Sequence, residues 1–269
     1  MILGIVAGEG NFPFLIAKEA KKNQFKVIAV CFHNHTDPKI EELLDDCLWV
    51  KVGQLGKIFS FFKKKGVKEI VFAGGIKKVK VLNIRPDLKG IKLLLKCRGK
   101  GDSAILSEVV RSFESEGFNI LSPLKFLPSL RVEEGVLTKR KPSSKEIKDI
   151  KFGWRIAKEI GRLDIGQCIV VKNEMVIAVE ALEGTDQTII RAGNLAGKGC
   201  TVIKIFKPGQ SELVDQPSVG LNTIKTMIEA KATCLALEAE KSLFFDKEKA
   251  IELANKEKIS IIGIKDFKL

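Results

Sequence analysis

Two polar turns in the second half of the chain carry side chains suited to chemistry on a charged substrate. The first turn, residues 183–186, follows the apolar run 175–182, and the second, residues 207–210, follows the apolar run 201–206. Polar turns between a strand and a helix are where α/β proteins place many of their binding sites. Acidic side chains in and after these turns, as far as Asp215, lie near Arg and Lys residues. This composition indicates chemistry on an anionic substrate.

The same residues also have a structural interpretation. Thr185 and Ser218 would be ordinary helix N-caps, and Asp186 would stabilise a first helical turn through the helix dipole. Because caps of this kind occur on most helices, spacing alone leaves both interpretations open.

The N-terminus offers a second candidate binding region. An apolar run at 2–7 is followed by GEGNFP, and the apolar run at 69–72 is followed by Ala73, Gly74 and another glycine. Two parallel strands that both end in glycine turns place these turns on one edge of the sheet. Glycine lets the backbone approach a phosphate, and a helix N-terminus favours negative charge. The third glycine of the dinucleotide fingerprint is missing, so ordinary tight turns remain the alternative.

Alternating strand and helix patterns predict an α/β protein with two domains. Residues 1–132 are expected to form a Rossmann-like, doubly wound parallel sheet. Residues 133–269 are expected to form an α/β domain with a mixed sheet, including a hairpin at 173–174. Asp102 is expected to cap one helix, and Ser143 or Ser144 another. The expected strands are 2–7, 27–32, 48–52, 69–72, 117–122, 168–172, 175–182, 201–207, 233–238 and 260–264, and helices are expected at 85–96, 145–160, 186–197, 219–230 and 247–257.

Composition limits the choice of partner. The chain has 269 residues, and 46 Lys plus Arg against 33 Asp plus Glu give a formal charge of +13, which favours an anionic partner. Tyr is absent and Trp occurs twice, so platforms for stacking nucleic-acid bases are scarce. We therefore expect a phosphate-bearing small molecule and no nucleic acid. The sequence has no run of about 20 apolar residues and no basic start of a signal peptide, so a cytoplasmic location is expected.

Cysteine and histidine usage argues against a structural metal site. Six cysteines, at 31, 47, 97, 168, 200 and 234, form no C-x-x-C pair and lie mostly in apolar runs. Buried free thiols in a reducing compartment explain this pattern. His33 and His35, the two histidines, are expected in a surface loop, with metal binding as the minor alternative.

Seven segments, in order along nearly the whole chain, resemble one known family. They are GIVAGEGNFP, FAGG, KGDSAIL, GRLDIGQCIVV, AVEALEGTDQTIIRAG, KPGQSELVDQPSVGLNTI and the terminal IIGI. Together they are similar to the UDP-2,3-diacylglucosamine pyrophosphatases, in the branch that lacks metallophosphoesterase motifs. The resemblance implies hydrolysis of UDP-2,3-diacylglucosamine to UMP and 2,3-diacylglucosamine 1-phosphate in lipid A biosynthesis. It also implies magnesium dependence, a UDP-binding domain at residues 1–132 and a catalytic and lipid-binding domain at residues 133–269. The substrate is implied to bind between the two domains.

The resemblance assigns roles to individual residues. The implied nucleotide-binding residues are Gly10, Asn11, Phe12, Ala73 and Gly74. The implied substrate contacts in the second domain are Gln167, Thr185 and Asp186, and Asp215 in the D-x-P-S turn is implied to be essential for catalysis. Two positions depart from the family pattern, since Glu9 stands where a glycine is usual and Gln216 where an apolar residue is usual.

The chemistry of a pyrophosphate fits these assignments. Its negative charges repel hydroxide, so hydrolysis needs charge neutralisation and a positioned water. Mg²⁺ prefers oxygen ligands, often one or two carboxylates. Asp215 and Asp186 are the candidates for metal ligand or general base, and the sequence does not separate these roles. Arg191, Lys204 and Lys207 are candidates to offset phosphate charge.

Other functions and partners remain open. An NAD(P)-dependent oxidoreductase is the main enzymatic alternative, although the glycine fingerprint is incomplete and no acid ends the second strand. A non-enzymatic nucleotide-binding protein is another, and a nucleic-acid binder is a weaker one. The basic charge also suggests peripheral contact with anionic lipids of the inner membrane. The sequence does not determine the oligomeric state, and a homodimer is one alternative.

Overall fold

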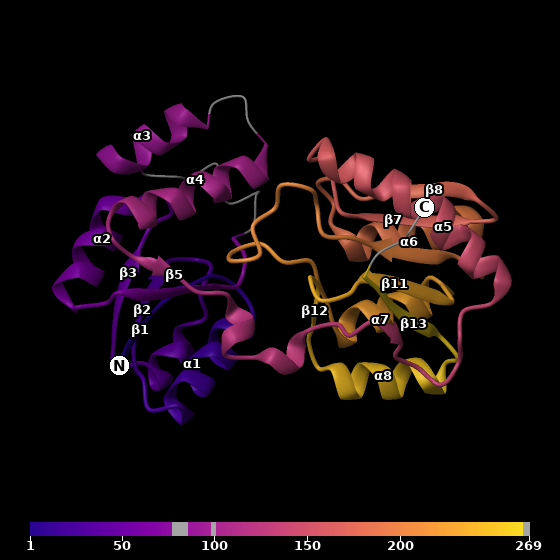
Figure 1. Ribbon diagram of the computed structural model, residues 1–269, viewed down its shortest axis with the longest axis horizontal. Coiled ribbons are helices and arrows are strands. Elements are labelled where there is room, and N and C mark those ends of the chain that lie inside the picture. Colours follow the sequence, from indigo (N-terminus) through magenta and orange to yellow (C-terminus); the bar gives the residue numbers. More distant parts are fainter. Residues whose placement is uncertain (77–85, 98–100, 266–269) are drawn as a thin grey trace. The chain divides into compact units, whose positions relative to one another are not determined.

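The computed structural model describes residues 1–76, 86–97 and 101–265, leaving aside the side chains of residues 102 and 103 (Figure 1). Grouped by their contacts, the residues form two compact units. The first consists of Met1–Ser129 together with Ser211–Asp215, and the second of Leu130–Gln210 and Gln216–Leu269.

The first unit is built on a parallel sheet with the strand order β3-β2-β1-β4-β5. In chain order its strands are β1 (Ile2–Ala7), β2 (Lys26–Phe32), β3 (Asp46–Val50), β4 (Glu69–Ala73) and β5 (Asn119–Ile120). Its helices are α1 (Phe12–Lys22), α2 (Leu55–Lys64), α3 (Leu88–Lys96) and α4 (Asp102–Ser115), with short 3-10 turns at Pro38–Leu43, Pro123–Lys125 and Pro128–Leu130.

Helices cover both faces of this sheet because successive strand side chains point to opposite sides. On one face, Val6 and Val30 pack in a cluster with Phe62 of α2 and Phe113 of α4. On the other face, the side chains of β1 and β2 pack against Ile16 of α1. The carboxyl ends of the strands are thereby held at one edge of a rigid layer.

The second unit contains a six-stranded mixed sheet with the order β6-β13-β11-β9-β7-β8. Its strands are β6 (Gly135–Val136), β7 (Cys168–Lys172), β8 (Met175–Val179), β9 (Thr201–Lys204), β11 (Cys234–Glu238) and β13 (Ser260–Ile264), and β10 (Ser218–Val219) pairs separately with β12 (Leu243–Phe244). Strands β9, β11 and β13 are parallel, whereas β6, β7 and β8 run antiparallel to their neighbours. One face is covered by α5 (Ser144–Arg162), and the other by α6 (Thr185–Ala196), α7 (Leu221–Glu229) and α8 (Lys247–Lys256).

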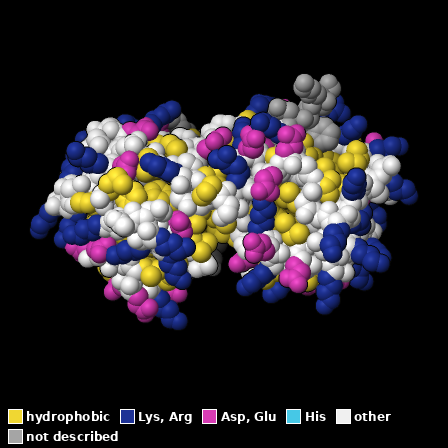
Figure 2. Space-filling model, turned by 60° about the horizontal axis from the view of Figure 1, so that its bottom comes forward, with side chains coloured by type: hydrophobic (Ala, Val, Ile, Leu, Met, Phe, Trp, Pro, Cys, Tyr) yellow, Lys and Arg dark blue, Asp and Glu magenta, His cyan; other side chains and the backbone are white. Residues whose placement is uncertain are grey.

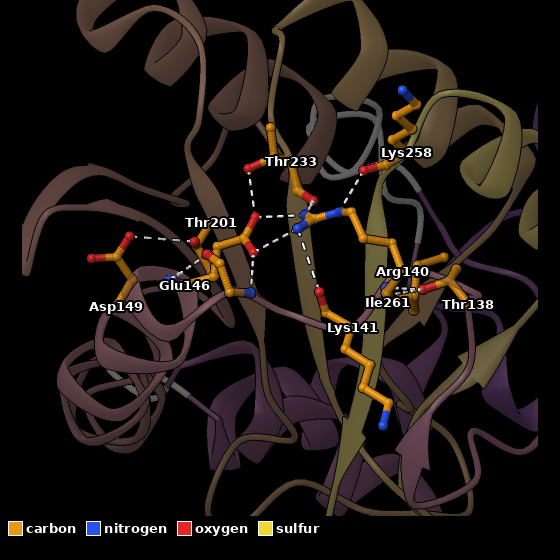
Figure 3. Close-up of polar contacts among 10 residues, drawn as sticks. Thr138, Arg140, Lys141, Glu146, Asp149, Thr201, Thr233, Lys258 and Ile261 are labelled. Carbon is orange, nitrogen blue, oxygen red and sulfur yellow. Dashed lines mark hydrogen bonds and ion pairs between the residues drawn. The ribbon is translucent and has the colours of Figure 1, made fainter.

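An ion pair with a buried carboxylate joins the start of α5 to the strands of the second unit (Figure 3). Arg140 Nη1 and Nη2 donate to the two carboxylate oxygens of Glu146 at 2.9 and 2.6 Å, and Arg140 also donates to the carbonyl oxygens of Thr233 and Lys258. Glu146 further accepts hydrogen bonds from the backbone N–H of Ser143 and the hydroxyl of Thr233. Burial alone would raise the pKa of Glu146, but these hydrogen bonds outweigh it and hold that pKa below its ordinary value.

Several fold predictions are confirmed. The α/β class, with one parallel and one mixed sheet, is as expected. Asn173 and Glu174, with φ of 51° and 55°, connect antiparallel β7 and β8 in the expected hairpin. Ser143 caps α5 and forms a capping box with Glu146.

Other boundaries are corrected. Gly101 is the N-cap of α4, so the prediction for Asp102, which begins the helix, is wrong. Helix α3 begins at Leu88 with Asp87 as its N-cap, and the start predicted at Arg85 lies outside the described residues. The strand predicted at 117–122 shrinks to β5, because few of its residues pair with β4. The strands β6, β10 and β12 were not predicted.

Candidate functional site

In the first unit, the two predicted glycine turns meet at the carboxyl ends of β1 and β4. The backbone N–H of Gly8 donates to the carbonyl oxygen of Ala73 at 2.8 Å. A Cβ on Gly8 would lie 2.5 Å from the carbonyl oxygen of Gly75. Gly74 has a φ of +84°, and a Cβ there would overlap the backbone of Glu9. This junction therefore requires glycine on both sides.

Gly10, Asn11 and Phe12 lead from this junction into α1. Gly10 has a φ of +87° and faces open space. Asn11 is the N-cap, yet its side chain makes no capping hydrogen bond, and the first turn of α1 contains no acid. The first N–H groups of a helix lack intrahelical partners and favour anions. Binding of a nucleotide phosphate by these three residues stays a prediction.

Glu9 makes a contact that the sequence did not indicate. Its Oε1 lies 2.9 Å from Nδ1 of His35, whose side chain is buried. The prediction that both histidines lie on a surface loop is therefore wrong for His35. His33 and Asn34 are exposed in the turn, as expected. At the edge of the sheet where the glycine turns meet, the Glu9 carboxylate is thus already within hydrogen-bonding distance of His35.

In the second unit, a hydroxyl group connects a buried acid to a buried amine. Thr185 Oγ1 donates to Glu180 Oε1 at 2.8 Å and accepts from Lys204 Nζ at 2.9 Å. Lys204 also donates to the carbonyl oxygen of Ser218 at 2.8 Å. Glu180 also accepts a hydrogen bond of 3.2 Å from the backbone N–H of Gln167. This hydrogen-bond network contains two of the predicted substrate contacts, Gln167 and Thr185. It also contains Lys204, one of the cations predicted to offset phosphate charge.

The pairing of the strands brings the residues of this hydrogen-bond network together from distant segments. Antiparallel pairing of β7 with β9 places Cys168 opposite Lys204, and β8 ends one residue before Glu180. Gly184, with a φ of +83°, then turns the backbone so that α6 begins at Thr185. The three strand ends and the helix start therefore converge on one hydroxyl group.

The structural interpretation of the polar turns holds in part. Asp186 does lie in the first turn of α6, where an acid stabilises the helix dipole. The N-cap of α6 is Gly184, so the N-cap interpretation of Thr185 is wrong. It is also wrong for Ser218, which lies in β10, because Gly220 is the N-cap of α7.

Two further predicted contact residues are engaged in ion pairs. Arg191 Nη2 lies 2.6 Å from Glu183 Oε1, and Lys207 Nζ lies 2.6 Å from Asp164 Oδ1. A phosphate group would have to compete with these carboxylates. Both residues stay predictions as substrate ligands.

Asp186 and Asp215, the predicted metal ligands, lie in different units. Asp186 is exposed, whereas Asp215 is half-buried in the segment Ser211–Asp215, whose Leu213 and Val214 pack against the core of the first unit. Within the described ranges, neither carboxylate has a side-chain hydrogen bond, and no three His, Cys, Asp or Glu side chains cluster as a metal site. Single unpaired carboxylates nevertheless fit Mg²⁺, which often takes one or two from the protein and completes its shell with phosphates and water.

Burial makes three of the cysteines unsuitable as nucleophiles. All six are free thiols, and five of them are buried, as expected. Burial raises the pKa of Cys31 to about 12 and raises the pKa of Cys168 and Cys234 as well. Since the thiolate is the reactive form, these groups are inert at neutral pH.

Comparison with known protein families accounts for nearly the whole chain. A model described as the LpxI N-terminal domain matches residues 2–130, and one described as the LpxI C-terminal domain matches residues 133–262. The chain belongs to the LpxI family. A relative from Caulobacter vibrioides, named UDP-2,3-diacylglucosamine pyrophosphatase LpxI, is 33% identical over 275 residues, which cover 97% of each protein.

Two solved structures with low similarity to this chain are biotin carboxylase domains. The biotin carboxylase domain of Hydrogenobacter thermophilus 2-oxoglutarate carboxylase is 14% identical with a TM-score of 0.25, and the match covers 72% of this chain and 41% of that one. A second structure, the biotin carboxylase domain of a thermophilic 2-oxoglutarate carboxylase, is 17% identical with a TM-score of 0.24, over 62% and 34% of the two chains. Such scores carry no argument about fold or function.

Sequence reasoning missed two features of this LpxI-family chain. Glu9 and His35 are 26 residues apart in the sequence, and no local pattern predicts their contact. Gln216, which follows Asp215, has both side-chain amide atoms buried and without a hydrogen-bond partner in the part of the chain that is described. The expectation of an apolar residue at this position, which the resemblance implied, was the available signal for Gln216.

Proposed function

We propose that this protein hydrolyses the pyrophosphate bond of UDP-2,3-diacylglucosamine, releasing UMP and 2,3-diacylglucosamine 1-phosphate in lipid A biosynthesis. The observation that carries the proposal is the match, along nearly the full length of both chains, to a relative named for this activity. The two LpxI family models that together span the chain support it.

The first unit would bind the nucleotide in a Rossmann-like manner. Its strand order, β3-β2-β1-β4-β5, reverses direction between β1 and β4. Ligands of open α/β sheets bind outside the carboxyl ends of the strands at such a reversal. The junction of Gly8 with Gly74 and the start of α1 lie at this point, and they support Gly10, Asn11, Phe12, Ala73 and Gly74 as the nucleotide-binding residues.

Asp215 and Asp186 are each a candidate to be a ligand of Mg²⁺ or the general base. Both carboxylates lack partners within the described ranges, and both carry the oxygen ligands that this ion prefers. When bound, Mg²⁺ supplies positive charge that offsets the phosphate oxygens. The Gln216 amide, buried beside Asp215 without a partner among the described groups, would be available to a polar group of the substrate.

The Thr185 hydroxyl has a defined remaining capacity. A hydroxyl offers one donor and two acceptor positions. Its donor is directed to Glu180 and one acceptor position is filled by Lys204, so one acceptor position remains. It would therefore accept a hydrogen bond from a water or a substrate hydroxyl. Lys204 has three N–H donors and uses two of them, so its third is available for an anionic oxygen.

The protein would work at the cytoplasmic side of the inner membrane, in peripheral contact with it, and a homodimer would be compatible with this role. In the residues covered by the structure, no helix is both long and apolar enough to cross a bilayer. On the face drawn in Figure 2, Lys and Arg side chains are spread over both units, with acidic side chains between them. Such a surface supports weak attraction to anionic lipids.

An assay with the lipid-linked nucleotide tests the proposal. The purified chain is incubated with UDP-2,3-diacylglucosamine, with Mg²⁺ or with EDTA, and the products are identified by mass spectrometry. We expect UMP and 2,3-diacylglucosamine 1-phosphate only when Mg²⁺ is present. Intact substrate in the presence of Mg²⁺ would reject the proposed activity.

A further inference from the structure

Helix α3 presents an apolar surface to solvent. Four of its nine residues are exposed aliphatic side chains, and Leu88 and Leu95 are 81% and 66% exposed. The other two are Ile91 and Leu94. Scattered exposed leucines need no explanation, but four on one short helix form a contiguous patch, which marks an interaction surface.

The orientation of α3 is fixed by its buried side. Leu93 packs in the core cluster that includes the aromatic side chains of α2 and α4, beside which Figure 1 draws this helix. Gly90 lies so close to the carbonyl oxygen of Gly53 that a Cβ could not be accommodated. Asp87 caps α3 through the N–H of Gly90 at 3.0 Å and also accepts the N–H of Gly56, at the start of α2, at 2.7 Å. The exposed side is therefore determined by the packing of the unit.

Lysines adjoin the apolar patch. At about 100° per residue, Leu94, Ile91, Leu95 and Leu88 follow one another around the helix, and Lys92 and Lys96 continue the same arc. Helix α3 contains no acidic residue. Lys92 and Lys96 are exposed and have no ion-pair partner among the described residues, whereas the third lysine of the helix, Lys89, is paired with Glu116.

We propose that α3 is the surface through which this protein docks on an anionic lipid bilayer. An apolar arc flanked by exposed lysines is the pattern of helices that lie in a membrane interface, where aliphatic side chains enter the acyl boundary and lysines reach anionic headgroups. The inference deepens the proposed function, because a diacylated substrate resides in a bilayer, but docking itself does not require hydrolysis.

A second copy of the chain fits this surface less well. A stable protein interface takes about 800 Å² from each partner, and four side chains on one nine-residue helix fall short of that area. Two copies facing each other through α3 would also bring Lys92 and Lys96 towards the same residues of the partner. Anionic lipid supplies the complementary charge instead.

Vesicle cosedimentation tests the assignment with paired variants. The full chain is mixed with vesicles of phosphatidylglycerol and phosphatidylcholine, and with phosphatidylcholine vesicles alone. L88A/L95A is expected to weaken partitioning into the anionic vesicles by about 10-fold for each leucine. K92E/K96E is expected to weaken it by about five-fold for each lysine and to reduce its salt dependence.

The controls carry equivalent changes on the second unit. L163A/L195A removes two exposed leucines, and K249E/K256E changes the net charge by the same amount as K92E/K96E. Both are expected to bind vesicles as the wild type does. Equal binding by wild type and L88A/L95A, or equal losses in the controls, would overturn the assignment to α3. A dimer that dissociates in L88A/L95A while vesicle binding is unchanged would assign the surface to a second copy instead.

Measuring hydrolysis in micelles and in vesicles distinguishes a failure of the docking proposal from a failure of the proposed activity. With substrate in detergent micelles, L88A/L95A is expected to hydrolyse at the wild-type rate within about two-fold, because no bilayer is needed, and to lose activity on substrate in vesicles. If the wild type hydrolyses neither preparation but still binds anionic vesicles, the proposed activity fails and the docking surface stands. If L88A/L95A loses activity equally in micelles and in vesicles, the effect is not docking and the assignment fails.

Discussion

The Arg140–Glu146 pair, whose carboxylate is buried, should be a large contributor to the stability of the second unit. Glu146 is 5% exposed, and its carboxylate accepts hydrogen bonds from Arg140, Ser143 and Thr233. In Glu146→Gln, one oxygen becomes an NH₂ group that faces N–H donors, so at least two charge-assisted bonds are lost. Because Arg140 remains about a third exposed and can be hydrated, we expect a loss at the low end for a broken buried pair, about 3 kcal/mol.

The two tryptophans allow the loss to be assigned to one unit. Trp154 lies in α5 of the second unit and Trp49 in β3 of the first. In a Trp49→Phe background, urea unfolding followed by fluorescence reports on the second unit alone. Glu146→Gln should lower the free energy of unfolding by about 3 kcal/mol, equivalent to roughly 10 °C in Tm for a unit of this size, without changing the urea dependence m. Glu159→Gln, which breaks the exposed pair with Arg162, should change it by less than about 0.5 kcal/mol.

The contribution of Glu146 should also depend on pH in one direction. Its pKa is lowered in the folded state, so the stabilisation is complete above the unfolded-state pKa of about 4.3. It is then lost as the pH falls from that value through the folded pKa. The difference between wild type and Glu146→Gln should therefore be constant from pH 6 to 7 and shrink below about pH 4.5. A loss under 1 kcal/mol, or a difference that grows in acid, would refute this reasoning.

Three further predictions concern the site. Asp215→Ala should lower kcat for the lipid-linked nucleotide on the order of 1,000-fold, whereas Glu212→Ala should stay within about three-fold; similar kcat values for both would remove Asp215 from the mechanism. Lys204→Met should lower kcat on the order of 100-fold, because the Thr185 hydroxyl loses its charged donor, and unchanged kcat in a folded variant would contradict that role. Gly74→Ala should weaken UDP binding at least about 10-fold in calorimetry, because its Cβ meets backbone and its φ is positive, and unaltered affinity would separate this turn from the nucleotide.

The sequence predicted the features that depend on a few adjacent residues, such as turns, hairpins and helix caps. The glycine turns after β1 and β4, the hairpin at Asn173 and the cap at Ser143 each follow from the conformational preference of a few adjacent residues. The α/β class follows from alternating strand and helix patterns. Residue type alone did not place every cap, since Gly184 rather than Thr185 is the N-cap of α6.

Long-range pairing explains what the sequence did not show. Glu180 and Lys204 approach Thr185 because β7 pairs with β9 and β8 in a mixed sheet, and no periodicity within one segment encodes that order. The grouping of Ser211–Asp215 with the first unit depends on Leu213 and Val214, two apolar residues within a polar stretch. That pair was a usable signal, because apolar residues in a polar turn need a core to pack against.

Hydrolysis in ¹⁸O-labelled water tests the central claim most directly. Purified full-length protein is incubated with UDP-2,3-diacylglucosamine and Mg²⁺, and both products are analysed by mass spectrometry. The proposed function predicts UMP and 2,3-diacylglucosamine 1-phosphate in equal amounts, one of them carrying a single ¹⁸O atom, and neither product when EDTA replaces Mg²⁺. Unhydrolysed substrate with Mg²⁺ present, or products without any ¹⁸O, would contradict it.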